Sequence, residues 1–221
     1  MSFLNISPID GRYQNKTRKL SGYFSEFGFM KYRVEVEIKY FIFLNKLLSN
    51  DEVSNKEFEI LSVLNNFGIE DCKRIKEIEE VCRHDVKAVE YFIQEKFQTP
   101  SLNLSDYNQF IHFGLTSQDI NNTSITKSLK DYIEKEYIPN LENIINSINE
   151  KARLWKDIVM LSRTHGQPAI PSTLGKELRV FSYRLEKQLD ILRNVRYYGK
   201  FGGAVGNLNA HYLAYPDINW E

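Results

Sequence analysis

The sequence predicts a mainly α protein, in which an N-terminal helical domain is followed by the first long helices of an antiparallel helical bundle. Apolar residues recur at three- and four-residue intervals along most of the 221 residues, which is the period of a helix with one buried face. Two of these patterns, near residues 125–155 and 174–192, are long. We find no internal repeat and no low-complexity segment.

The composition bounds the class of protein. Hydrophobic residues make up 42% of the chain, which excludes wholesale disorder. Lysine plus arginine and aspartate plus glutamate number 29 each, so there is no general attraction to nucleic acid or to an anionic membrane. No apolar run approaches the roughly 18 residues of a membrane span. We expect neither a nucleic acid nor a membrane as partner, although one local phosphate pocket remains compatible with this balance.

The cysteines and the first residues indicate the cytoplasm. Met1 to Asn5 lack a charged region followed by a long apolar region, so no secretory signal is visible. Cys72 and Cys82 match no metal-binding spacing. We expect two plain thiols, as in a cytosolic protein, and no metal.

Residues 1–100 form the predicted N-terminal helical domain. Residues 1–22 are polar, and the segment from Ser7 to Arg12 is predicted to be a loop. Apolar spacing then predicts four helices, over residues 24–48, 57–66, 71–81 and 85–97. We expect Gly68 to stop the second helix and Asp85 to cap the last. The run Thr99-Pro100-Ser101 marks the expected domain boundary.

Residues 101–221 form the predicted first part of a central helical-bundle domain, which is truncated. A short helix is expected over 104–112, and a polar stretch from Thr116 to Thr123 precedes the first long helix. Pro139 should kink that helix because proline removes a backbone donor. The segment from Asp157 to Pro171 breaks the helical period and is predicted to be a polar loop. After the second long helix, residues 199–206 hold four glycines.

Four short segments have an unusual density of polar side chains. They are Asp10–Tyr13, Arg83–Asp85, His112–Asn122 and Arg163–Gln167. None of them is a phosphate loop, a serine-hydrolase elbow or an HExxH zinc motif. The glycines from Gly202 to Gly206 do not predict a dinucleotide loop, because no strand is expected before them.

Each segment has a structural reading beside a functional one. Arg12 is either a solvated cation or, beside Tyr13, a clamp for phosphate oxygens. His84 either begins a helix or is a histidine oriented by the charge of Asp85. Both readings stay open on spacing alone.

The two remaining segments have the same ambiguity. The run from Thr116 to Asp119 is a helix N-cap cluster, and its hydroxyls and free amides also suit a carboxylate. His165 is predicted to lie in an exposed polar loop, where functional residues concentrate, but one histidine is compatible with either reading.

Considered in order, these segments resemble the motifs of the fumarase/aspartase superfamily. The matching motifs are Gly114-Leu115-Thr116-Ser117-Gln118-Asp119-Ile120-Asn121, Thr164-His165-Gly166-Gln167 and Gly203-Ala204-Val205-Gly206. Within that superfamily, Pro8–Tyr13 and Arg83–Phe92 are similar to the adenylosuccinate lyase family, and not to argininosuccinate lyases or fumarases. The resemblance runs from about residue 4 to the end of the chain.

The resemblance implies a homotetramer with a fumarase/aspartase-type helical bundle, which releases fumarate by β-elimination. The implied substrates are adenylosuccinate, which gives AMP, and succinylaminoimidazole carboxamide ribotide, which gives the carboxamide ribotide. Both steps belong to purine nucleotide biosynthesis, and no cofactor is implied.

The resemblance also implies a role for each matched residue. His165 is the implied general acid, which protonates the departing nitrogen. The implied substrate-binding residues are Arg12 and Tyr13 at the phosphate, His84, Asp85 and Lys87 in the pocket, His112, Thr116 and Ser117 near the carboxylates and the nucleotide, and Gln167 in the segment of His165.

One family motif has no counterpart in this sequence. The family carries a flexible loop after the Gly-Ala-Val-Gly segment, and a serine of that loop is the general base. We therefore expect the 221-residue chain to be inactive alone. Two alternatives stay open: a non-catalytic helical assembly module, and another fumarate-releasing lyase. The first is opposed by the matched side chains that the chain retains, Arg12, His84, His112 and His165. The segment Asp10–Tyr13 argues against the second.

Overall fold

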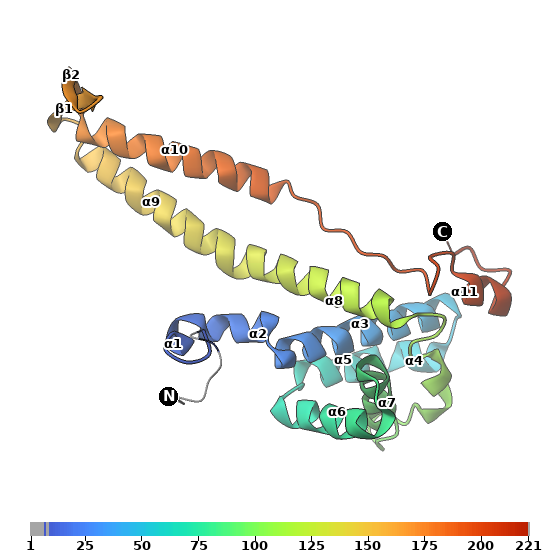
Figure 1. The fold of residues 1–221 in the computed structure, drawn as a ribbon. Coiled ribbons are helices and arrows are strands. Elements are labelled where there is room, and N and C mark those ends of the chain that lie inside the picture. Colours follow the sequence, from blue (N-terminus) through green and yellow to red (C-terminus); the bar gives the residue numbers. More distant parts are fainter. Residues whose placement is uncertain (1–6, 8, 221) are drawn as a thin grey trace. The chain divides into compact units, whose positions relative to one another are not determined.

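The computed structural model describes residues 7 and 9–220, and helices dominate it (Figure 1). The mainly α fold class is confirmed, and the one sheet among the described residues has two strands. The chain forms two compact units, residues 1–129 with 198–221, and residues 130–197. The boundary expected near residue 100 stays a prediction about domains. The signal-sequence expectation at Met1 to Asn5, and Pro8 of the first family motif, lie outside the described residues.

Helix α3 (Glu26–Leu47) forms the centre of the first unit. Helices α5 (Glu57–Asn65), α6 (Ile69–Cys82) and α7 (Asp85–Phe97) pack against it. One continuous apolar core joins them, and it contains the fully buried side chains Phe41, Phe92 and Phe97. Burying a side chain of this size stabilises the fold by roughly 1.5–3 kcal/mol. The four helices predicted for this region are confirmed, with bounds shifted by a few residues at most.

Short elements precede these helices, lie between them or follow them along the chain. They are α1 (Gln14–Thr17), η1 (Arg18–Leu20), α2 (Ser21–Phe24), α4 (Asp51–Asn55), η2 (Ser105–Phe110) and α11 (Asn209–Ala214). The short helix expected over 104–112 is the 3₁₀ turn η2, whose flanking residues Leu104 and Ile111 are buried in the core of the first unit.

Two predicted helix ends are wrong. Gly68 does not stop α5; its backbone is extended, and its N–H donates to Oδ2 of Asp71 at 2.9 Å, at the start of α6. Asp85 is not the cap of α7 but its first residue. The cap is His84, whose ring nitrogen accepts from the N–H of Lys87. An aromatic nitrogen takes the place that a carboxylate or hydroxyl usually occupies.

The second unit is a pair of antiparallel helices joined by a hairpin (Figure 1). Helix α8 (Ser117–Tyr132) begins in the first unit and continues as a π-helical turn, η3 (Ile133–Tyr137), and then as α9 (Ile138–Leu154). Pro139 lies in the first turn of α9. Because proline has no N–H to donate to the carbonyl four residues earlier, the regular α pattern breaks where the kink was expected. Helix α10 (Leu174–Arg193) packs along α9.

The segment expected to be a polar loop is instead a β-hairpin. Strand β1 (Val159–Thr164) pairs antiparallel with β2 (Gln167–Thr173). The two-residue turn between them has φ of 51° at His165 and 76° at Gly166. Positive φ at both positions is the type I′ turn, which matches the twist of paired strands. None of the described helices is long and apolar enough to cross a membrane.

Candidate active site

His84 links the start of helix α7 to the start of helix α8. Arg83, with φ of 58°, ends α6 in the left-handed conformation and turns the chain so that His84 becomes the N-cap of α7. Nδ1 of His84 accepts from the backbone N–H of Lys87 at 3.1 Å, so Nε2 carries the hydrogen of the neutral ring. That Nε2 lies 3.3 Å from Oγ of Ser117. The structure thus brings His84 and Ser117 together.

Asp85 forms an ion pair with Arg33, and its predicted role in a substrate pocket stays a prediction. Its Oδ2 accepts from the guanidinium of Arg33 at 2.5 Å. The same guanidinium donates to Oδ1 of Asn121 at 2.9 Å and stacks on Phe29, so it ties α3, α7 and α8 together. Burial alone would raise the pKa of Asp85, but the charge and hydrogen bonds of Arg33 hold it below its usual value.

Thr116 and Ser117 are positioned by the buried carboxylate of Asp119. That carboxylate accepts from the N–H of Thr116 at 2.8 Å and from the N–H groups of Gly202 and Gly203, both at 3.0 Å. Lys200 adds an ion pair at 2.8 Å. Burial would raise the pKa of Asp119, but Lys200 and the backbone donors lower it. The glycine-rich segment is therefore clamped to the start of α8.

The role of Asp119 was not predicted from the sequence. The signal that could have found it is the spacing of Thr116 and Asp119, since an acidic residue at the third helical position accepts from the N-cap N–H. Its two glycine partners, far along the chain, are not visible in any local pattern.

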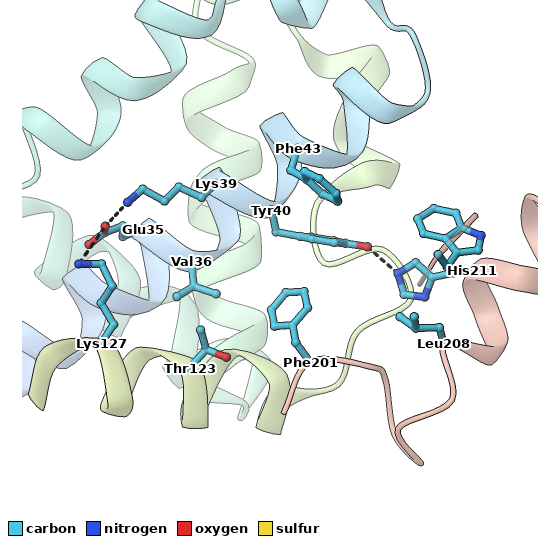
Figure 2. Close-up of a pocket in the computed structure, with 11 residues that line it drawn as sticks. Glu35, Val36, Lys39, Tyr40, Phe43, Thr123, Lys127, Phe201, Leu208 and His211 are labelled. Carbon is cyan, nitrogen blue, oxygen red and sulfur yellow. Dashed lines mark hydrogen bonds and ion pairs between the residues drawn. The ribbon is translucent and has the colours of Figure 1, made fainter. Parts of the chain in front are cut away.

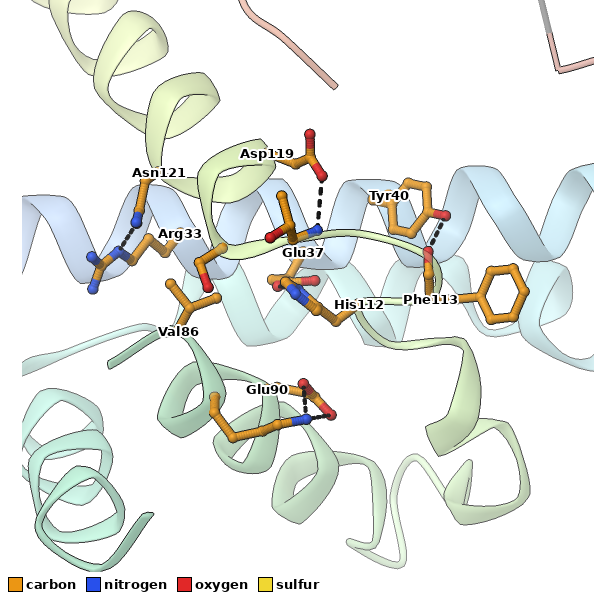
Figure 3. Close-up of polar contacts among 12 residues, drawn as sticks. Arg33, Glu37, Tyr40, Val86, Glu90, His112, Phe113, Asp119 and Asn121 are labelled. Atoms are coloured by element: carbon orange, nitrogen blue, oxygen red, sulfur yellow. Dashed lines mark hydrogen bonds and ion pairs between the residues drawn. The ribbon is translucent and has the colours of Figure 1, made fainter. Parts of the chain in front are cut away.

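His112 lies on a loop between η2 and α8, with φ of 57°. Its Nδ1 lies 2.6 Å from Oε1 of Glu37, a residue of α3 that is fully buried (Figure 3). Burial by itself lowers the pKa of His112, but the hydrogen bond and charge of Glu37 raise it above its ordinary value. Glu37 was not predicted as a site residue, although an acid inside an apolar helical stripe was a usable signal.

Lys87 is ion-paired with Glu90 at 2.8 Å, one turn along α7. Glu90 is buried, and its charge acts on both Glu37 and His112. The hydrogen bond and charge of Glu90 outweigh the effect of burial and raise the pKa of Lys87. Lys87 thus keeps its charge, which Glu90 balances, beside the Glu37–His112 pair.

His211 is a fourth histidine, and no role was predicted for it. It is buried, and its Nε2 lies 2.7 Å from the hydroxyl of Tyr40, which itself donates to the carbonyl of Phe113 at 2.7 Å. Because the hydroxyl hydrogen points to that carbonyl, Nε2 of His211 must be the donor. A cavity of about 430 Å³ opens beside Tyr40, Phe201 and His211 (Figure 2).

Arg12 and Tyr13 lie together near the start of the described chain. The guanidinium of Arg12 lies 5.4 Å from the ring centre of Tyr13, and both side chains are exposed. Within residues 7 and 9–220 no hydrogen bond or ion pair joins this pair to His84, Ser117 or His112. Their predicted role at a phosphate stays a prediction.

His165 and Gln167 belong to the second unit. His165 occupies the tip of the hairpin and is exposed, as predicted, and Gln167 pairs with Thr164 where β2 begins. The side chain of His165 is outside any apolar core, so its ring is free to meet a ligand or another chain.

A protein-family model described as Lyase matches residues 11–219. The chain is 51% identical to an adenylosuccinate lyase of Dictyostelium discoideum, over 97% of this chain and 48% of that protein. It is 47% identical to the adenylosuccinate lyase of Vibrio cholerae (98% and 48%) and 44% identical to that of Escherichia coli K12 (100% and 49%). The chain therefore spans about half the length of the curated relatives it matches.

Solved structures share the fold at lower identity. A fumarate lyase from Mesorhizobium sp. BNC1 superposes with a TM-score of 0.68 at 22% identity, covering 89% of this chain and 44% of that one. A β-carboxy-cis,cis-muconate cycloisomerase from Acinetobacter calcoaceticus sp. ADP1 gives 0.65 at 20% identity, covering 88% and 44%. The likeness is one of fold.

Proposed function

The chain belongs to the lyase family whose model it matches, and from that premise we propose that it is the N-terminal portion of an adenylosuccinate lyase. The observation that carries the proposal is its 43–51% identity to adenylosuccinate lyases over nearly all of its length. The reaction removes fumarate from adenylosuccinate to leave AMP, and from the succinylated imidazole carboxamide ribotide in the same way.

The geometry of the first unit suits the carboxylate chemistry of this reaction. Elimination removes a proton from the carbon next to a carboxylate, so negative charge develops there and needs hydrogen-bond donors. The start of α8 offers backbone N–H groups and the hydroxyls of Thr116 and Ser117. His84 adds an Nε2–H beside Ser117. These donors form a cradle for one substrate carboxylate.

We assign the remaining steps by the family resemblance. His165 gives a proton to the departing nitrogen, the role of a general acid. Arg12 holds the nucleotide phosphate, since a guanidinium binds two phosphate oxygens at once. The base that removes the carbon-bound proton is a serine outside this sequence, so the 221-residue chain alone is proposed to be inactive.

We propose that the full-length protein is a cytoplasmic homotetramer. The homotetramer, though not the compartment, is supported by large apolar side chains that α9 and α10 leave uncovered among the described residues, including Ile144, Phe181 and Ile191. Exposed apolar faces of this kind mark surfaces for association, here proposed to be with the helices of other subunits. To test whether subunits share an active site, the chain can be refolded with a full-length His165→Ala variant. Regained fumarate release would support shared sites, and absence of release would argue against them.

Calorimetry tests the proposed substrate class. The full-length protein should bind adenylosuccinate and should not bind argininosuccinate, which has the same succinyl group without a purine. Binding of argininosuccinate alone would favour another fumarate-releasing lyase. Binding of neither compound would favour a non-catalytic assembly module.

A further inference from the structure

The carboxylate of Glu37 is an unusual group to find at the centre of helix α3. Its side chain is 0% exposed, and the apolar residues Val34, Ile38 and Phe41 of the same helix are equally buried. Helix packing at this position needs no acid, and burying one is costly unless its oxygens are paired. Burial accordingly raises the pKa of Glu37.

Only one oxygen of this carboxylate has a partner. Oε1 lies 2.6 Å from Nδ1 of His112, whereas Oε2 accepts no hydrogen bond from any described residue. A buried polar atom left without a partner calls for a functional explanation. Because imidazole is a stronger base than a carboxylate, the proton between the two atoms belongs to the ring.

The bond to Glu37 fixes which nitrogen of His112 remains available. With Nδ1–H donating to Oε1, the other nitrogen is Nε2, and none of the described residues forms a hydrogen bond with it. The side chain of His112 is 16% exposed, so the ring is not sealed off from a ligand. The left-handed backbone at His112 holds the ring at this position.

The neighbouring charges favour a protonated ring. Glu37 and Glu90 are two buried carboxylates, and Lys87 supplies one cation, at 2.8 Å from Glu90. A protonated His112 supplies the second cation and balances the cluster. The hydroxyl of Tyr40, which also faces Glu37, donates to a backbone carbonyl. The carboxylate of Asp119 does not need His112 as a partner, because it already accepts hydrogen bonds from Lys200 and three backbone N–H groups.

We propose that Glu37 is a positioning residue, which holds His112 as an imidazolium whose Nε2–H binds an anionic carboxylate of the substrate. The ligand class rests on the proposed function, because adenylosuccinate and fumarate both carry two carboxylates in the reacting portion. Glu37 does not touch the ligand and acts only through His112. His112 in turn supplies a charged donor on the loop that leads into the carboxylate cradle at Thr116 and Ser117.

The relationship between Glu37 and His112 can be tested without any ligand. The chain has four histidines, so labelling their Cε1 atoms with ¹³C gives four signals in an NMR pH titration, and His112→Asn identifies one of them. Glu37→Gln, which has the same shape without the charge, should lower the titration midpoint of His112 by about one pH unit. The matched control Glu35→Gln removes an acid of α3 that pairs with Lys39, and it should leave the midpoint unchanged.

An unchanged midpoint in Glu37→Gln would overturn the proposal. If that variant does not fold, Glu37→Asp can be used, which keeps the charge but moves it one methylene away from His112. The titration midpoint of His112 should then fall by less than is expected for Glu37→Gln. No shift in a folded Glu37→Asp protein would contradict the positioning role equally.

Fumarate affinity of the full-length protein tests the ligand class. Affinity should fall as the pH rises through the pKa of His112, because the neutral ring no longer offers a charged donor. Glu37→Gln should move this fall about one pH unit lower. Equal affinities of the two proteins at every pH would refute the carboxylate role. Failure of the unaltered protein to bind fumarate would instead contradict the proposed function, and the NMR midpoint would still decide the relationship between Glu37 and His112.

Discussion

Nε2 of His84 lies 3.3 Å from Oγ of Ser117, and the other nitrogen of the same ring caps helix α7. One side chain therefore has two roles: it caps the first turn of α7, and it supplies a donor at the start of α8. The capping bond uses the lone pair of Nδ1, so the donor at Nε2 exists because the helix begins at this residue.

Two substitutions of His84 separate its capping role from its binding role. His84→Ala should lower the free energy of unfolding by about 1 kcal/mol through the lost cap and should also weaken substrate binding. His84→Asn keeps a good N-cap, so stability should be retained while binding is still weakened. Thermal unfolding and calorimetry on both variants check this, and an Asn variant with normal affinity would remove His84 from the site.

Asp119 should make stability depend on pH at the acid end. Its pKa is lowered in the fold, so its contribution is present above the pKa of the unfolded chain and is lost as the pH falls through the lower folded value. Asp119→Asn should cost about 3 kcal/mol at pH 7, because an amide cannot replace a carboxylate that accepts from three N–H groups and Lys200.

Urea unfolding of both proteins at several pH values measures this contribution. The difference between them should shrink steadily as the pH falls below about 4. A constant difference down to the most acid point would mean that Asp119 contributes through its shape and not through its charge.

The hairpin turn allows the proposed acid role of His165 to be tested without disturbing the fold. Asn-Gly is the favoured pair for a type I′ turn, so His165→Asn should preserve the hairpin while removing the acid. In the full-length protein it should lower kcat by roughly 10²-fold or more. His165→Ala should lose as much activity and also strain the turn. Near-normal kcat in the Asn variant would exclude His165 as the general acid.

Arg12 should discriminate ligands by their phosphate. Arg12→Ala removes a charge-assisted contact, so affinity for AMP should fall on the order of 10- to 100-fold. Adenosine, which lacks the phosphate, should bind the two proteins almost equally. Equal losses for AMP and adenosine would contradict a phosphate role.

The helices could be predicted from the sequence because their signal is local. Apolar residues recur at helical spacing from Phe27 to Leu48, and the observed α3 covers this stretch up to Leu47, with Leu48 as its C-cap. The hairpin was missed because a strand pair this short has no long periodic pattern. The only sequence signal for its turn is a His-Gly pair, and such a pair also occurs in loops.

The partners of the site residues could not be predicted, because they are distant in sequence. Glu37 meets His112 across 75 positions, and Gly202 meets Asp119 across 83. In the sequence, Glu37 is visible only as an acid among apolar residues, and Gly202 only as part of a cluster of glycines. Only the packed fold shows which group each of them meets.

Fumarate release is the most direct measurement of the central claim, which is that this chain is the N-terminal portion of an adenylosuccinate lyase. The full-length protein and the 221-residue chain should each be given adenylosuccinate, and fumarate followed by its absorbance. We predict release by the full-length protein and none by the chain alone. Absence of release by a folded full-length protein would contradict the proposed function, and release by the chain alone would mean that a group within it replaces the missing base.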